Sequence, residues 1–195
     1  IQELHRRGVR PKIAYVDEEC CGSWLPVLQA AWPGIHVRLD VMHAIRRLAQ
    51  TTTSTQHPCH GKFCAMLSNA FFGADESVLR RLAGAWRREH GSIPLPRDIE
   101  RKYVPRSIRD PISIASDIDE GLEGFQHMSA SCGPLLTEAT HDAWFRLRRH
   151  VLKGCLSDPI DVRVTSPDRA DTIGRECFRT VRTFRGTSTV ERLHS

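Results

Sequence analysis

Apolar residues near the start of the chain follow two spacings, one typical of strands and one typical of helices. Short runs of β-forming residues at 12–17 and 36–40 each end in an aspartate and predict buried strands. Segments 23–32 and 41–50 carry apolar residues at helical spacing, and Asp40 stands where it can cap the second of these helices. This order predicts two parallel strands joined by a right-handed crossover.

The pattern becomes mainly helical after the threonine-rich segment 51–55. Residues 157–174 are expected to form a loop, and alternation of apolar and polar residues over 176–184 predicts a strand. Ser188 is then placed to begin a final helix. The predicted helices cover 58–72, 76–90 after an Asp75 cap, 97–103, 112–129 and 137–155. The inward face of helix 41–50 is expected to carry Met42, Ile45, Leu48 and Ala49.

Composition narrows the class of protein. The chain has 195 residues, of which 40% are hydrophobic, and this is enough to bury a core. No apolar run reaches the roughly 18–20 residues that a membrane-spanning helix needs, so no membrane association is expected. Seven cysteines, an odd number at irregular spacings, argue against a secreted disulfide framework and favour a reducing compartment.

The net charge of +5 is distributed unevenly. Residues 80–106 hold eight basic and three acidic side chains, and residues 143–195 hold eleven and six. Residues 110–142 hold seven acidic side chains and no Lys or Arg. The basic segments are candidates for binding a polyanion, and ordinary solvated helix faces are the alternative explanation.

Asp17 is the first candidate for chemistry because it follows a predicted parallel strand. Functional groups in open α/β sheets gather at the carboxyl ends of strands, where a carboxylate can bind a metal ion. Asp40 follows the next strand, and His43 lies three residues further on, near the same helix face. The alternatives are a loop or cap role for Asp17, a helix N-cap for Asp40, and a structural role for His43.

The cysteine and histidine pattern gives weaker signals. One stretch offers four zinc-type ligands, but four donors crowded at one helix start cannot easily form a tetrahedron, so a zinc site there is not expected. These are His57, Cys59, His60 and Cys64. The adjacent Cys20 and Cys21 have no usual metal or redox spacing and are expected to be small buried thiols.

Three segments, taken in order, resemble DDE-type transposases. Residues 13–21 read IAYVDEECC, residues 37–47 read VRLDVMHAIRR, and residues 184–194 read FRGTSTVERLH. More narrowly, they resemble transposase-derived proteins of animal genomes that carry a VRLD-x-x-H-x-x-R-R segment and a late R-G-(S/T)-(T/S)-x-x-E-x-x-H segment. Such proteins have an RNase H-like fold with three metal-binding carboxylates.

The resemblance implies an α/β architecture in which a helical insertion interrupts a partial RNase H-like core. Residues 1–50 would form the second half of the core, 51–175 the insertion, and 176–195 the last core strand and the start of a helix. Asp17 would be the second metal-binding aspartate and Glu191 the final glutamate.

The resemblance also implies a site, a cofactor and a partner. Asp17 and Glu191 would hold Mg²⁺ or Mn²⁺, with Asp40 and His43 close by. The partner would be DNA, either transposon ends or other duplex DNA, and a homo-oligomer is left open. The location would be intracellular and nuclear. Four arginines flank the proposed site and would neutralise phosphates, namely Arg46, Arg47, Arg182 and Arg185.

The chain departs from the family pattern at its start. Residues 1–11 contain no aspartate and leave no room for the three antiparallel strands that open the RNase H-like fold. We therefore expect a fragment that lacks the first catalytic aspartate and does not catalyse strand transfer alone. The alternatives are a domesticated, non-catalytic DNA-binding or protein-interaction module, and an unrelated helical domain with chance matches. For Ser188 and Glu191, a helix capping box is the competing interpretation.

Overall fold

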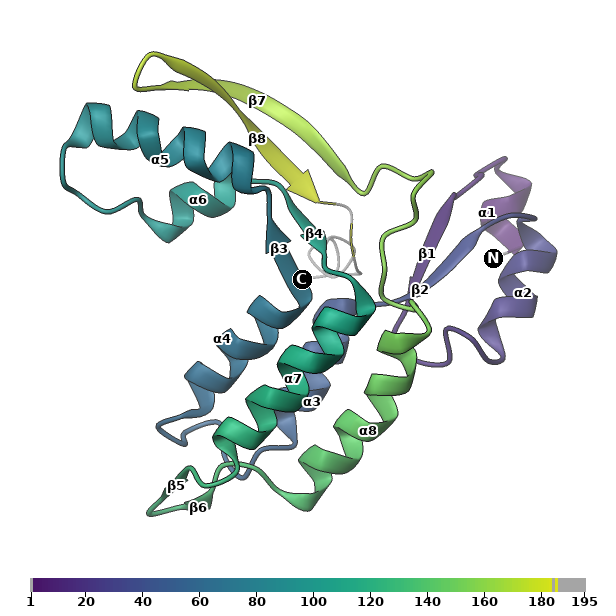
Figure 1. Cartoon of the computed structure of the whole chain (residues 1–195). Helices are drawn as coiled ribbons and strands as arrows, with labels where there is room; N and C mark the ends of the chain where they lie inside the picture. The colour runs from purple at the N-terminus through teal and green to yellow at the C-terminus, as the bar shows by residue number, and fades with distance from the viewer. Residues whose placement is uncertain (1, 184, 186–195) are drawn as a thin grey trace. The chain divides into compact units, whose positions relative to one another are not determined.

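A computed structural model describes residues 2–183 and 185, and its helices and strands are labelled in Figure 1. The fold is mixed α/β, and each sheet has two strands. Contacts divide the chain into two compact units. The described part of the first unit is 2–71 and 108–162, and that of the second is 72–107, 163–183 and 185.

The first unit contains the predicted parallel pair of strands. β1 (Ile13–Val16) pairs with β2 (His36–Leu39), with Val16 opposite Leu39. Helix α2 (Trp24–Ala31) forms the crossover, and the short α1 (Gln2–Arg6) precedes β1. The strand–helix–strand prediction is therefore confirmed.

Four helices of the first unit form a bundle. Helix α3 contacts α4 and α8, and α7 contacts the same two helices, so the contacts close into a ring (Figure 1). The small hairpin of β5 (Ser129–Ala130) and β6 (Gly133–Pro134) connects α7 to α8. The bundle helices are α3 (Val41–Gln50), α4 (His60–Phe71), α7 (Pro111–Phe125) and α8 (Glu138–Leu152). Fully buried side chains at its centre include Leu48, Phe63, Leu67, Ile118 and Val151.

The predicted inward face of α3 needs one correction. Met42 is half exposed, whereas Val41, Ala44 and Leu48 are buried. These three residues are spaced i, i+3, i+7 from the first position of the helix, so they form a single stripe. Met42 lies outside that stripe, and its assignment to the core was wrong.

The second unit combines two helices with a long antiparallel hairpin. Helix α5 begins after Asp75, whose side chain accepts hydrogen bonds from the backbone N–H groups of Ser77 and Val78, as the cap prediction required. Strand β3 pairs with β4, and β7 pairs with β8. The bounds are β3 (Phe72–Ala74), α5 (Glu76–His90), α6 (Arg97–Tyr103), β4 (Arg106–Ile108), β7 (Thr165–Ile173) and β8 (Glu176–Thr183).

Strand β8 confirms the predicted strand, but the loop expected over 157–174 is wrong for residues 165–173. The two strands join through a two-residue turn in which Gly174 and Arg175 have φ angles of 53° and 71°. Positive φ at both positions is typical of a type I′ turn, which suits the twist of a hairpin. β7 was missed because its sequence is polar and contains Pro167, so its own pattern carries no strand signal.

The compact units do not follow the predicted boundaries at residues 50 and 175. Helices α4, α7 and α8 pack with α3 because each shares apolar surface with the bundle, and β8 pairs with β7. An RNase H-like core, and its completion by residues 176–195, stay predictions. Ser188 and Glu191 lie outside the described residues. No helix among those described is long and apolar enough to cross a membrane.

Candidate metal centre

The parallel sheet brings two aspartates and a histidine to one edge. Asp17 directly follows β1, and Asp40 directly follows β2. Because Val16 lies opposite Leu39, the two aspartates leave the sheet at the same end. His43 lies in the first turn of α3, one turn beyond Asp40. The predicted grouping of Asp17, Asp40 and His43 is therefore present in the fold.

These three side chains are close enough to share one ligand. The Nδ1 atom of His43 contacts Asp17 Oδ1 and lies 3.7 Å from Asp40 Oδ2. One donor atom from each residue lies within 4.8 Å of the others. The Asp17 side chain is 60% exposed and that of Asp40 1% exposed, so the group is open to solvent on the Asp17 side.

Asp40 also caps α3, as one of the alternatives predicted. Its Oδ1 accepts hydrogen bonds from the backbone N–H groups of Met42, at 2.8 Å, and His43, at 3.2 Å. The second oxygen, Oδ2, is the one that faces the His43 ring. One buried carboxylate therefore fixes the start of the helix and the position of the histidine.

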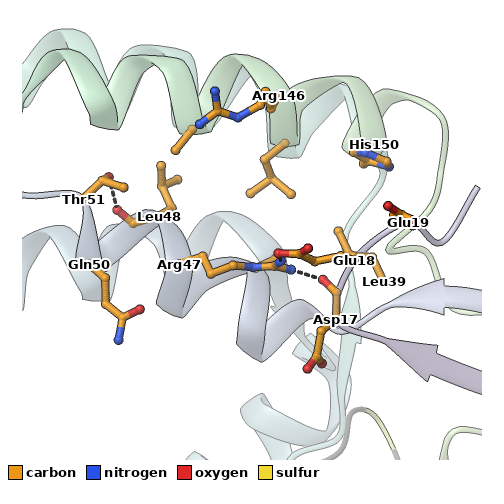
Figure 2. A pocket seen from close by; sticks show the side chains of 13 residues that line it. Asp17, Glu18, Glu19, Leu39, Arg47, Leu48, Gln50, Thr51, Arg146 and His150 are labelled. Atoms are coloured by element: carbon orange, nitrogen blue, oxygen red, sulfur yellow. Dashed lines mark hydrogen bonds and ion pairs between the residues drawn. The ribbon is translucent and has the colours of Figure 1, made fainter. Parts of the chain in front are cut away.

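A pocket of about 580 Å³ adjoins this group, between the loop after β1, α3 and α8. Its acidic and basic lining residues are Asp17, Glu18, Glu19, Arg47 and Arg146. Arg47 donates to Glu18 Oε1 at 2.7 Å and to the backbone carbonyl of Asp17. Figure 2 shows the Asp17 carboxylate pointing away from Arg146. Arg47 therefore ties α3 to the loop that carries Asp17.

The four predicted DNA-binding arginines have different surroundings. Arg46 is exposed on α3, and Arg47 is engaged as described. Arg182 is exposed, with Asp168 Oδ2 at 3.9 Å, whereas Arg185 is 8% exposed. Arg46 and Arg47 belong to the first unit and the other two to the second. DNA contact by these residues stays a prediction, and Glu191 lies outside the described residues.

A second ligand group, which sequence reasoning missed, lies on the first unit. Cys20 and Cys21, from the loop after β1, meet His150 and Cys155 at the end of α8. The expectation of a buried thiol is confirmed for Cys20 and wrong for Cys21, which is exposed. Hydrogen bonding to Cys155 raises the pKa of Cys20, and the same bond, with His150 nearby, lowers the pKa of Cys155.

The histidine and cysteine cluster at the start of α4 is not a ligand group. His57 Nδ1 accepts a hydrogen bond from the backbone N–H of Cys59, and His60 lies 3.1 Å from the Thr52 hydroxyl and 3.4 Å from Cys64 Sγ. Donor atoms of these residues do not converge in groups of three among the described residues. These contacts join residues that lie close together in the sequence.

Comparisons with known proteins give no relative for this chain: no family model matches it, and neither does any curated protein or solved structure.

Proposed function

We propose that this chain is part of a DDE transposase-like DNA nuclease or strand transferase, with a divalent metal site at Asp17, Asp40 and His43. The observation that carries the proposal is the convergence of these three side chains at the carboxyl end of a parallel strand pair. Metal-dependent phosphodiester chemistry needs hard oxygen donors at an edge that a DNA backbone can reach. Asp17 supplies such a donor because it is exposed.

The donor set supports one ion more readily than two. Two carboxylate oxygens and one imidazole nitrogen suit Mn²⁺ better than Mg²⁺, because Mg²⁺ strongly prefers an all-oxygen shell. A bound ion would polarise a phosphate oxygen or lower the pKa of a bound water. The His43 ring must be neutral, with Nδ1 unprotonated, to act as a ligand, so ion binding would replace the Asp17–His43 contact.

The proposed DNA contacts rest on Arg46, which is exposed on α3 three residues after His43. Arg47 supports the proposal indirectly because it holds the loop that carries Asp17. Each phosphate that a protein neutralises releases counterions, so the binding constant falls with salt at a slope of about −0.9 per contact on duplex DNA. With one bound ion in place of the two that serve an in-line displacement at phosphorus, this site would bind DNA without joining it.

One observation favours the non-catalytic alternative. His43 and Asp17 already contact each other, so these two potential ligands have a partner without any metal. In a domesticated module this pair would only fix the loop after β1 against α3. The two functions differ in whether the group binds Mn²⁺.

The test is a titration of the full 195-residue chain with Mn²⁺. Calorimetry and electron paramagnetic resonance measure how much Mn²⁺ binds and how tightly. We expect one bound ion, and at least a tenfold loss of affinity in Asp17→Asn. The matched control is Asp142→Asn, which removes an exposed carboxylate from α8 and should bind as the wild type does. Equal affinities in all three proteins, or no binding, would exclude the metal site and leave the non-catalytic module.

The DNA part is tested separately by measuring duplex affinity against salt concentration. Arg46→Ala should weaken binding across unrelated sequences and reduce the magnitude of the salt slope by about 1. The control is Lys62→Ala, which removes an exposed basic side chain of α4 that lies outside both basic segments. A salt-independent affinity would show that phosphates are not what the chain binds.

A further inference from the structure

The thiol and imidazole group on the first unit has the composition of a closed zinc site. Cys20, Cys21 and Cys155 supply three sulfurs, and His150 supplies a nitrogen. One donor atom from each lies within 4.8 Å of all the others. Three cysteines and one histidine form one of the common ligand sets of structural Zn²⁺. The donors come from segments about 130 residues apart, so local sequence does not explain their meeting.

The distances match those of a tetrahedron around zinc. Zinc–sulfur bonds of about 2.3 Å and zinc–nitrogen bonds of about 2.0–2.1 Å place neighbouring S and N donors about 3.6 Å apart. The His150 Nδ1 atom lies 3.4 Å from Cys20 Sγ and 3.6 Å from Cys21 Sγ. The geometry therefore needs no large movement to accept an ion.

The end of α8 presents two of the donors through its own backbone. Gly154, two residues after the end of α8, has a φ of 71° and terminates the helix. Its N–H donates to the carbonyl of Val151 at 2.9 Å, and the N–H of Cys155 donates to the carbonyl of His150 at 3.0 Å. This is a Schellman motif with Lys153 as the C-cap residue. The motif brings together the side chains of the residue three before the C-cap and the residue two after it. His150 and Cys155 occupy these two positions.

The sheet and the loop after β1 hold the other side of the group. The carbonyl of Cys155 accepts a hydrogen bond from the N–H of Leu39 in β2, at 2.8 Å. Glu19 has a φ of 54°, and its carbonyl accepts from Gly22, so the chain turns sharply at the two cysteines. Both donor pairs are thus positioned by main-chain structure, which is the preorganisation that a metal site needs.

A thiol network alone accounts for the group less well. Cys20 and Cys155 are buried and contact each other, so two thiols satisfy one another. Cys21 is exposed and gains nothing by turning to His150 for packing. A metal ion explains why a third sulfur and a nitrogen converge on the same pair.

We propose that Cys20, Cys21, His150 and Cys155 bind one Zn²⁺ ion that fastens the loop after β1 to the end of α8. The ion is structural, because four protein donors fill a tetrahedral shell and leave no position for substrate. Its binding free energy adds to folding, since the unfolded chain does not hold the donors together. The loop it fastens begins at Asp17, so zinc also restrains the edge that carries the candidate metal centre.

The test uses the full chain, purified under reducing conditions, with metal content measured by elemental analysis and Co²⁺ used as a spectroscopic substitute. We expect one Zn²⁺ per chain, and a Co²⁺ form with thiolate charge-transfer bands and the intense visible bands of tetrahedral coordination. Cys21→Ser should weaken binding more than the roughly 10–100-fold that loss of an outer-shell partner costs. Cys21 is exposed, so this variant should fold, which circular dichroism would check.

Two controls separate this proposal from its competitors. Cys132→Ser removes an exposed thiol outside the group and should keep full zinc content. Asp17→Asn should also keep it, so a failure of the Mn²⁺ site would leave the zinc site intact. The proposal is overturned if zinc is absent from the wild-type chain and does not bind on addition. It is equally overturned if Cys132→Ser loses as much zinc as Cys21→Ser.

Discussion

Replacing Asp40 tests how much the buried cap contributes to the first unit. In Asp40→Ala, the backbone N–H groups of Met42 and His43 lose the acceptor that lies 2.8 and 3.2 Å away. Loss of an aspartate N-cap costs about 0.5–2 kcal/mol. Asp40 is 1% exposed, so water does not replace the lost acceptor easily. We therefore expect a free energy of unfolding about 2 kcal/mol lower, at the upper end of that range.

Asp40→Asn separates the cap from the charge. Asparagine caps helices as well as aspartate does, because its side-chain oxygen can accept the same two hydrogen bonds. We expect the stability of this variant to stay within about 0.5 kcal/mol of the wild type. The amide nitrogen that takes the place of Oδ2 cannot bind a metal ion, so the affinity for Mn²⁺ should fall as it does in Asp17→Asn. Stability and metal binding would thus respond to different atoms of one residue.

The assay is urea denaturation at neutral pH, followed by far-ultraviolet circular dichroism and tryptophan fluorescence. A change of 1 kcal/mol shifts the midpoint temperature of a chain of this size by roughly 2–4 °C, so Asp40→Ala should also melt about 4–8 °C lower. The control is Asp110→Ala, which removes an exposed cap from α7 and should cost less. Equal losses in Asp40→Ala and Asp40→Asn would refute the capping argument, since they would assign the stability to charge.

Two further predictions concern the second unit. A left-handed backbone conformation costs a residue with a Cβ atom roughly 1–2 kcal/mol. Gly174→Ala should lower the free energy of unfolding by more than this, because the added Cβ would lie 2.3 Å from the carbonyl oxygen of Ala85. An unchanged thermal melt would contradict this expectation. Hydrogen bonds from Tyr103 and Lys102 lower the pKa of Asp171 in the folded protein. The ionised Asp171 therefore stabilises the fold above the ordinary aspartate pKa of about 3.9, and this stabilisation is lost as the pH falls through the lower pKa of the folded state. The melting difference between wild type and Asp171→Asn should therefore shrink on acidification, and a constant difference would refute the assignment.

Local chemistry made much of the fold predictable. Asp40 and Asp75 were recognised as caps because their side chains act on the next turn of the same helix, and both do so. The parallel pairing of β1 and β2 followed from one crossover helix between two apolar runs. Since that pairing also sets where the strands end, the meeting of Asp17 with Asp40 could be anticipated.

Features that depend on distant partners could not be read from the chain. Strand β7 forms because β8 supplies its hydrogen bonds. The polar sequence of β7 itself does not indicate a strand. Cys20 and Cys155 meet only after the bundle closes and the end of α8 reaches β2. The spacing rules for zinc motifs describe donors that lie near each other in the sequence. They do not detect a group whose donors come from two segments about 130 residues apart.

The chain that follows α8 has a consequence for the solution behaviour of the protein. The backbone N–H of Leu39 donates to the carbonyl of Cys155, and the side-chain Nε of Arg38 donates to the carbonyl of Ser157, both at 2.8 Å, so this segment lies along the edge of β2 away from β1. In the described part of the chain, β1 has β2 as its one strand neighbour. Its sequence, Ile13–Val16, is apolar and holds no charged residue to discourage further pairing.

Among the described residues, β1 is therefore the edge of this sheet with which a further strand can pair. Strand edges without a strand partner are templates for aggregation and for pairing between chains. A lysine introduced at Ala14 would blunt the edge without touching either ligand group. A charge on β1 would oppose such pairing at the strand itself, whereas the net charge of +5 acts between whole molecules.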